Sequence, residues 1–460
     1  MTQSAFHIAR ADLGLFTDLY ELTMAQTYFD EGMFGDATFD LFVRSYPPNR
    51  GYLVCAGLED VLEFLEGVSF GDGARQYLRE LGMFSEKFLD YLGNLSFNGT
   101  VRAIPEGRIF FCNEPVLQVT APIIAAQLVE TLLINRLNLQ SLQATKAARC
   151  AWAAQGRTVS DFGARRAPGV DGALTMARAG YIGGFQSTSN VMAARRYGLP
   201  PAGTMAHSMI TAYPTELEAF RAYAKAFPHR TILLLDTYDT IEGAYNAAQV
   251  GKELEEAGHR LVGVRLDSGD YLDLSKRVRG ILDDAGLGYV KIVASGGLDE
   301  YEIARLVEDG APIDIFGVGT RVSVSADAPY TDMSYKLACY EGRPVMKLSP
   351  DKVSPPGTKQ VYRFKDAQGN FEGDIVALDE ENLPGGEALL ETVMERGGRT
   401  RPAPTLSQAR ERFSHDFERL REGFKRIENP PRYPVVLSNQ LQLLTEQTQN
   451  KLIEQCNYQH

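Results

Sequence analysis

Cysteine is scarce in this sequence, and so are long apolar runs. Among 460 residues there are five cysteines, and none stands in a CxxC pair. Such isolated cysteines indicate reduced, buried thiols and argue against a disulfide framework or a zinc site. The longest apolar runs, such as residues 231–235 and 313–318, are far too short to cross a bilayer. The sequence therefore predicts a protein without a transmembrane segment. The cysteines are Cys55, Cys112, Cys150, Cys339 and Cys456.

The sequence also has fewer basic than acidic residues. The chain has 47 Lys and Arg against 59 Asp and Glu, a formal net charge of -12, and no run of Lys or Arg offsets this locally. Nucleic acid is therefore not expected as a partner. The first 14 residues include Arg10 and Asp12 and lack an apolar core with a cleavage site. No secretory signal is expected, and the sequence predicts a cytoplasmic protein.

The composition is that of an ordinary globular enzyme, with 44% hydrophobic and 23% charged residues. The length is about three times that of a typical domain, which predicts two or three units. Residues 1–130 are expected to form a largely antiparallel α+β domain, and residues 341–460 a C-terminal extension that packs on it and on the central domain. Strand-like runs of the first domain lie at 37–43, 52–56, 100–104, 108–111 and 116–119. A charged helix is expected near 408–427.

The central domain, residues 131–340, alternates short apolar runs with segments of helical period, which is typical of a parallel βα array. Seven such strands are compatible with a closed barrel or an open doubly wound sheet. Polar or glycine-rich residues follow each run, as they do at the active-site end of barrels. The expected strand ends are 157–163, 181–188, 204–208, 231–236, 261–267, 291–297 and 313–320. The expected helices are 215–227, 241–257, 271–284 and 300–309.

Two glycine clusters end consecutive strands of this array. They are Ser295-Gly296-Gly297 and Gly317-Val318-Gly319-Thr320. A single glycine after a strand is more often a tight turn than a binding site. Two clusters on adjacent late strands, however, favour backbone amides that hold a phosphate.

An acidic cluster follows the strand before them. Asp267, Ser268 and Asp270 place two carboxylates and a hydroxyl in the segment LDSGD. They could bind ribose hydroxyls or a Mg²⁺ ion that bridges to phosphates, because hard cations prefer carboxylate oxygens. The alternative is a helix cap, which suits Asp270 but not Asp267, since Asp267 lies too far upstream.

His207 is the one histidine expected at the carboxyl end of a strand. A lone histidine is more often structural. Asp236, at the end of the next strand, could hydrogen-bond one ring nitrogen and leave the other as a nucleophile. Phe162 and Tyr20 could sandwich an aromatic ring, although aromatic residues more often belong to the core.

Arg165 and its neighbour Arg166 follow the first of these strands. They could clamp a carboxylate or a phosphate through two parallel hydrogen bonds, or they could form surface ion pairs.

Five segments together resemble nicotinate phosphoribosyltransferases, in the same order and over residues 12 to 425. They are TDLYELT at 17–23, DFGARR at 161–166, GTMAHS at 203–208, VRLDSGD at 264–270, and KLS at 347–349 followed by KQVYR at 359–363. The resemblance implies an irregular seven-stranded α/β barrel of the type II phosphoribosyltransferases. It also implies a homodimer in which the N-terminal domain contributes to the partner's active site.

The resemblance implies a reaction as well. Nicotinate and phosphoribosyl diphosphate would give nicotinate mononucleotide and diphosphate, coupled to ATP hydrolysis, in the salvage route to NAD. Such an enzyme is classified as a ligase, uses Mg²⁺ and forms a phosphohistidine.

The resemblance further assigns roles to individual residues. His207 would be phosphorylated by ATP and oriented by Asp236, and Asp267 would hold the ribose or Mg²⁺. Tyr20 from the partner subunit and Phe162 would stack on the pyridine ring. The remaining residues expected to bind substrate are Arg165, Ser189, Arg265, Ser268, Gly296, Gly297, Gly319 and Thr320.

Three alternatives remain at this point. Nicotinamide phosphoribosyltransferase is the main one, although the nicotinamide enzyme has an aspartate where this chain has Ser189, and an acid there would repel a carboxylate. A Schiff-base lyase could use Lys291, but this lysine begins its strand. A non-catalytic nucleotide sensor is disfavoured by the presence of His207 and Asp267.

Overall fold

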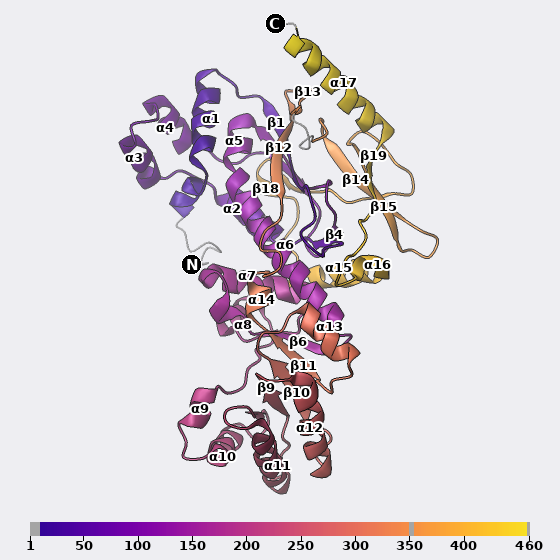
Figure 1. Ribbon diagram of the computed structural model, residues 1–460. Coiled ribbons are helices and arrows are strands. Elements are labelled where there is room, and N and C mark those ends of the chain that lie inside the picture. The colour runs from indigo at the N-terminus through magenta and orange to yellow at the C-terminus, as the bar shows by residue number, and fades with distance from the viewer. Residues whose placement is uncertain (1–9, 349–353, 458–460) are drawn as a thin grey trace. The chain divides into compact units, whose positions relative to one another are not determined.

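The computed structural model describes residues 10–348 and 354–457 (Figure 1). Contacts between Cα atoms divide the chain into two compact units. The continuous unit comprises residues 143–329, and the discontinuous unit comprises residues 1–142 and 330–460; the boundary falls within helix α6 (Glu130–Ala153). His7, Ser349 and His460 lie outside the described residues, as does the side chain of Cys456.

The continuous unit contains a parallel sheet with the strand order β7-β6-β11-β10-β9-β8. In chain order its strands are β6 (Thr158–Asp161), β7 (Ser187–Thr188), β8 (Ile232–Leu234), β9 (Gly263–Leu266), β10 (Lys291–Ser295) and β11 (Ile315–Val318). Its helices are η2 (Ala164–Arg166), α7 (Gly169–Ile182), α8 (Val191–Tyr197), α9 (His207–Thr211), α10 (Glu216–Ala226), α11 (Thr240–Glu256), α12 (Tyr271–Asp284), α13 (Glu300–Glu308) and α14 (Thr320–Ser323). Helices α11 and α12 pack against β9 and β10 (Figure 1).

Two of the expected strands differ from the structure. Residues 204–208 form no strand; His207 instead begins helix α9, and Met205 is the only buried residue of the five. A run with one buried side chain lacks the apolar face that would hold it in a sheet. The expected strand at 181–188 shrinks to Ser187–Thr188, because helix α7 continues to Ile182.

The sheet therefore has six parallel strands rather than the expected seven. In the described part of the chain the ladder ends at β7 and β8, and an isolated bridge joins Thr188 to Pro201 beyond β7. The α/β class is confirmed, whereas closure into a barrel stays a prediction.

The helices of this unit begin where capping side chains follow the strands. Thr215, Asp239, Asp270 and Asp299 each accept a hydrogen bond from a backbone amide in the first turn of α10, α11, α12 and α13, respectively. A capping side chain satisfies an amide that the helix itself leaves free. These caps hold the end of each βα loop in place, and the four helices match their expected ranges to within one residue.

The discontinuous unit contains three sheets. Their strand orders are β13-β12-β1-β5-β3-β17-β18, β16-β14-β15-β19 and β2-β4. The strands are β1 (Asp36–Val43), β2 (Leu53–Val54), β3 (Thr100–Ala103), β4 (Ile109–Phe110), β5 (Pro115–Pro122), β12 (Met333–Tyr340), β13 (Arg343–Pro344), β14 (Lys359–Lys365), β15 (Phe371–Leu378), β16 (Glu387–Ala388), β17 (Glu391–Glu395), β18 (Gly398–Arg399) and β19 (Val435–Leu437). The largest sheet is antiparallel throughout.

The described residues of the discontinuous unit form more helices than the single charged helix that the sequence predicted there. These helices are η1 (Arg10–Leu15), α1 (Leu19–Asp30), α2 (Leu58–Gly67), α3 (Asp72–Glu80), α4 (Glu86–Gly93), α5 (Ile123–Leu128), α15 (Leu406–Arg419), α16 (Glu422–Lys425) and α17 (Asn439–Asn457). The charged helix expected near 408–427 is thus divided into α15 and α16, and α17 was not expected.

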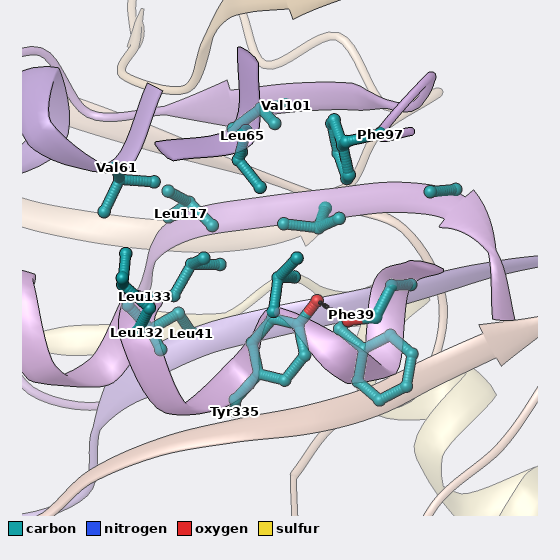
Figure 2. Close-up of a cluster of buried hydrophobic side chains, with 14 of the residues drawn as sticks. Phe39, Leu41, Val61, Leu65, Phe97, Val101, Leu117, Leu132, Leu133 and Tyr335 are labelled. Atoms are coloured by element: carbon teal, nitrogen blue, oxygen red, sulfur yellow. Dashed lines mark hydrogen bonds between the residues drawn. The ribbon is translucent and has the colours of Figure 1, made fainter. Parts of the chain in front are cut away.

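The core of this unit joins segments that lie far apart in the sequence. The rings of Phe39 on β1 and Tyr335 on β12 stack with centroids 4.7 Å apart and planes 4° apart (Figure 2). The Tyr335 hydroxyl donates to the carbonyl oxygen of Ala126, at 2.8 Å. Burial of these aromatic rings with the aliphatic side chains around them stabilises the pairing of β1 with β12.

The cysteines and the hydropathy agree with the sequence-based expectations. Cys55, Cys112 and Cys150 are buried, Cys339 is partly buried, and none of these four cysteines forms a disulfide. Within residues 10–348 and 354–457, no helix combines the length and the apolar character needed to cross a membrane.

Candidate active site

The carboxyl ends of four neighbouring strands bring the polar loops of the continuous unit together. Leu234 of β8 pairs with Arg265 of β9, and Leu266 pairs with Ala294 of β10. Ser295 in turn pairs with Gly317 of β11. Because these strands are parallel, the loops that follow them emerge at one edge of the sheet.

His207 begins the short helix α9, and its imidazole is partly exposed. Its Nδ1 atom lies 3.1 Å from the Thr237 hydroxyl, and its Nε2 atom lies 3.8 Å from Oδ2 of Asp267. The ring is therefore held on one side by a hydroxyl and faces a carboxylate on the other. One ring nitrogen is left without a close hydrogen-bond partner, as a nucleophilic imidazole requires.

Asp236 contacts a different group from the one expected. The Ser268 hydroxyl donates to its Oδ2 atom at 2.5 Å, and its Oδ1 atom is buried without a hydrogen-bond partner. No hydrogen bond within the described residues joins Asp236 to His207; Thr237, the next residue, takes that place. The role of Asp236 as the residue that orients the histidine stays a prediction.

Asp267 connects the histidine to the first glycine cluster. The Ser295 hydroxyl donates to its Oδ1 atom, while Oδ2 faces His207. Asp270 has the capping role that was expected as the alternative, since it accepts from the amides of Leu272 and Asp273 at 3.0 and 3.3 Å. Asp267 is thus the carboxylate of this loop that faces His207 rather than capping a helix.

Arg265 is a partly buried cation near the end of β9. Its Nη1 atom donates to the Thr204 hydroxyl at 2.7 Å, and its Nε atom is buried without a partner. Burial lowers the pKa of Arg265, and the carboxylates of Asp267 and Asp236 partly oppose that effect. A partly buried guanidinium with unused donors is suited to an anionic ligand.

The glycine clusters have the backbone geometry of an anion site. Gly296 and Gly297 have φ values of 92° and 68°, which favour glycine. Gly319 precedes Thr320, the exposed first residue of α14. Within the described residues, the amides of Gly296, Gly297, Gly319 and Thr320 donate to no other protein group. Such free amides at adjacent strand ends can bind phosphate oxygens.

Phe162 lies against the second glycine cluster. A Cβ atom built at Gly317 would come within 2.7 Å of the Phe162 ring, so glycine at this position lets the ring rest on β11. Ser189 is partly buried, and its amide donates to the carbonyl oxygen of Asp161 at 2.8 Å. Arg165 is exposed in η2, three residues after Phe162 in the chain.

Tyr20 belongs to the discontinuous unit and has 49% of its surface exposed. Leu19 and Phe16 beside it are also exposed, at 50% and 38%. Burial and the adjacent Glu21 carboxyl raise the pKa of the Tyr20 hydroxyl. The ring is therefore open to a partner from outside this chain.

Lys291 lies at the amino end of β10, opposite to the glycine cluster of the same strand. Its ammonium group pairs with Asp314 at 2.8 Å and is 57% exposed. A Schiff-base lysine would need a desolvated site near the loops, so this position argues against the lyase alternative.

The site offers carboxylate ligands for a divalent cation but not a complete set of protein ligands. Within the described residues there is no group of three or more His, Cys, Asp or Glu side chains that could hold a metal. Mg²⁺ commonly uses one or two carboxylates together with water and substrate phosphates. Asp267 and the unpartnered Oδ1 atom of Asp236 fit that mode of binding.

Three residues of the site were not singled out from the sequence. Thr204 holds Arg265, Thr237 holds His207, and Tyr271 donates to the carbonyl oxygens of Ser295 and Gly296. Thr204 and Thr237 each stand beside a residue that the motifs highlighted. Tyr271 likewise follows Asp270 of the motif at 264–270, but its hydrogen bonds to the end of another strand could not be predicted from that position.

Three family models match the chain. The nicotinate phosphoribosyltransferase N-terminal domain matches residues 15–138, the nicotinate phosphoribosyltransferase family matches residues 158–358, and the nicotinate phosphoribosyltransferase C-terminal domain matches residues 385–445.

Individual proteins are similar over nearly the whole length. A nicotinate phosphoribosyltransferase of Mycobacterium tuberculosis is 49% identical over 431 residues, which cover 93% of this chain and 92% of that protein. The Bacillus subtilis protein of the same name is 40% identical, with 93% of each chain covered. The crystal structure of human nicotinic acid phosphoribosyltransferase matches with a TM-score of 0.85 at 32% identity, over 94% of this chain and 99% of that one.

Proposed function

Because this chain belongs to the nicotinate phosphoribosyltransferase family, we propose that it joins nicotinate to phosphoribosyl diphosphate, with release of diphosphate, in the salvage route to NAD. The observation that carries the proposal is a continuous set of contacts. His207 faces Asp267, Asp267 accepts from Ser295, and Ser295 begins the first glycine cluster. One edge of the sheet therefore brings an imidazole, a carboxylate and free amides close together.

The sugar phosphate is held mainly by backbone. The amides of Gly296 and Gly297 on one loop and of Gly319 and Thr320 on the next bind the 5′-phosphate. Asp267 and Ser268 bind the ribose hydroxyls, since a carboxylate accepts from two of them. Arg265 adds the partly buried cation that neutralises a phosphate or carboxylate.

The pyridine ring is held by aromatic stacking and charge. Phe162 covers one face of the ring, and Tyr20 of the partner subunit covers the other. Arg165 and Arg265 are the cations that hold the nicotinate carboxylate. Ser189 is neutral, so it does not repel that carboxylate as an aspartate would.

The chemical step needs little acid or base catalysis. Displacement of diphosphate from the ribose C1 atom develops positive charge on the sugar and negative charge on the leaving group. Positioning the ring nitrogen and stabilising the leaving group supply the rate enhancement. Asp267 and Asp236 would hold a Mg²⁺ ion, which would supply positive charge to neutralise the leaving diphosphate.

ATP hydrolysis is coupled through phosphorylation of His207, which makes the enzyme a ligase by classification. The ring is partly exposed, and one nitrogen is held by Thr237. The γ-phosphoryl group passes from ATP to the free ring nitrogen, with ADP as leaving group, and is later released to water as phosphate. The added negative charge favours the closed, substrate-loaded state.

The active enzyme is a cytoplasmic homodimer. Three large hydrophobic side chains that lie close together in the sequence are exposed, and such side chains suit an interface with a second subunit. They are Phe16, Leu19 and Tyr20. The alternative substrate is nicotinamide, whose amide could use the same ring stack.

The activity is tested with the purified full-length chain, nicotinate, phosphoribosyl diphosphate, ATP and Mg²⁺. Nicotinate mononucleotide and diphosphate should form in equal amounts, and excess nicotinamide should compete poorly. Preferential conversion of nicotinamide would reverse the assignment.

Phosphorylation is tested with γ-labelled ATP. The wild type should take up acid-labile label, and His207→Ala should take up none. His415→Ala serves as the matched control, because His415 is exposed and lies in the discontinuous unit. Label retained by His207→Ala would disprove the phosphohistidine.

A further inference from the structure

The loop after β9 and the loop after β10 are fastened to each other by side chains that the proposed chemistry does not use. The Tyr271 hydroxyl lies 2.5 Å from the carbonyl oxygen of Ser295 and 2.9 Å from that of Gly296. In the opposite direction, the Ser295 hydroxyl donates to Asp267. Each loop therefore supplies one hydroxyl that bonds to the other.

Tyr271 is placed so that its hydrogen bonds fix the loop after β9 relative to the loop after β10. It is the first residue of α12, directly after the cap residue Asp270, and only 8% of its surface is exposed. Burial raises the pKa of Tyr271, with a further contribution from Asp267, so the hydroxyl keeps its proton and acts as a donor at neutral pH. A buried donor with two carbonyl partners leaves the loop little freedom.

The backbone at Gly296 is in close contact with the same loop. A Cβ atom built at Gly296 would collide with the carbonyl oxygen of Asp267 and come within 2.9 Å of the Tyr271 hydroxyl. The carbonyl oxygens of Ser295 and Gly296 are thus directed at Tyr271, and the amides of Gly296 and Gly297 carry no protein partner. Fixing the carbonyls on one side fixes the direction of the amides on the other.

We propose that Tyr271 and Ser295 form a clamp of positioning residues, which sets the glycine amides that bind the 5′-phosphate at a fixed distance from the Asp267 carboxylate. The clamp rests on the proposed function, because it acts on phosphoribosyl diphosphate at both ends of the ribose. Neither hydroxyl of the clamp is among the groups proposed to hold the pyridine ring. The clamp therefore governs the binding of phosphoribosyl diphosphate and leaves that of nicotinate unchanged.

The kinetic test uses Tyr271→Phe, which removes the hydroxyl and keeps the ring. The KM for phosphoribosyl diphosphate should rise about 3- to 10-fold, as expected for one lost hydrogen bond, while the KM for nicotinate stays at the wild-type value. Tyr289→Phe is the matched control: its hydroxyl bonds to Glu255 at 3.2 Å, away from the loops, and its removal should change neither constant. Equal changes in both KM values, or no change, would overturn the proposal.

A second arm is independent of catalysis. Hydrogen exchange of a peptide spanning residues 295–298 should be faster in Tyr271→Phe than in the wild type, and unchanged in Tyr289→Phe. Unchanged exchange in Tyr271→Phe would show that the hydroxyl does not order the loop, whether or not the chain forms nicotinate mononucleotide. If the wild type has no activity but the exchange difference is present, the clamp stands and the proposed function fails.

A double variant that combines Tyr271→Phe with Ser295→Ala tests the two clamp residues together. If they hold one structural unit, the double variant should lose less affinity for phosphoribosyl diphosphate than the product of the two single losses. Strictly multiplicative losses would contradict a shared clamp.

Discussion

Alanine substitution should have different effects at the two adjacent glycines of the first cluster, so the variant at Gly297 serves as the reference for the variant at Gly296. Both have positive φ, 92° at Gly296 and 68° at Gly297. A Cβ atom built at Gly297 has nothing within 4 Å, whereas one at Gly296 would collide with the Asp267 carbonyl oxygen. Alanine therefore adds backbone strain at both positions and a steric conflict at Gly296 alone.

The expected losses in kcat/KM follow from the backbone strain and from the steric conflict. Left-handed backbone costs a non-glycine residue about 1–2 kcal/mol, so Gly297→Ala should lower kcat/KM for phosphoribosyl diphosphate about 5- to 30-fold. Gly296→Ala carries the same strain and also pushes Asp267 away, which breaks its hydrogen bond with Ser295. That bond to a charged group contributes about 1.5–3 kcal/mol, so the combined loss should be at least about 100-fold.

The assay is steady-state kinetics with phosphoribosyl diphosphate varied at saturating nicotinate. Gly280→Ala is the control, because Gly280 is exposed within α12 and has open space around it. That variant should keep wild-type kinetics and gain slight stability, since alanine favours helix. Equal losses for Gly296→Ala and Gly297→Ala would refute the steric argument, and wild-type kinetics in both would remove this loop from the phosphate site.

Four further predictions concern other parts of the chain. Tyr20→Ala should raise the KM for nicotinate about 2- to 10-fold through lost stacking, while Tyr20→Phe stays near wild type; identical kinetics for both would exclude a stacking role. Ser189→Asp should lower the preference for nicotinate over nicotinamide at least about tenfold, through repulsion of the carboxylate, measured by competition between the two pyridines. Glu300→Gln should lower the free energy of unfolding by about 3–5 kcal/mol, because it removes the buried carboxylate that pairs with both Lys146 and Arg149, although Lys146 keeps its ion pair with Asp327. Glu302→Gln at an exposed ion pair should change it by under about 1 kcal/mol, and denaturant titration distinguishes the two variants. Burial raises the pKa of Glu21 from 4.5 to about 7, so the folded protein holds this proton at pH values where the unfolded chain has lost it. The free energy of unfolding of the wild type should therefore fall as the pH rises from 4.5 toward 7. A Glu21→Gln variant with the same pH dependence of unfolding would contradict this.

The sequence was most informative where structure depends on neighbours in the chain. The cap at Asp270 and the start of α12 at Tyr271 were predictable, because a capping side chain acts on amides two or three residues away. Residues 204–208 were assigned wrongly to a strand, because a short run shows whether a strand is locally possible but not whether a neighbouring strand exists to pair with it. The family resemblance is confirmed by the matches over residues 15–138, 158–358 and 385–445.

What the sequence determined by itself is which chemical groups the loops of the continuous unit offer: an imidazole at 207, carboxylates at 236 and 267, and glycines near 296 and 319. The tertiary structure decided which of these atoms meet. Thr237 rather than Asp236 contacts His207, and Tyr271 reaches the carbonyls of Ser295 and Gly296. The physical reason is that such contacts depend on strand order and register, and hydrogen bonds between distant segments, such as those that place β6 beside β11, set both.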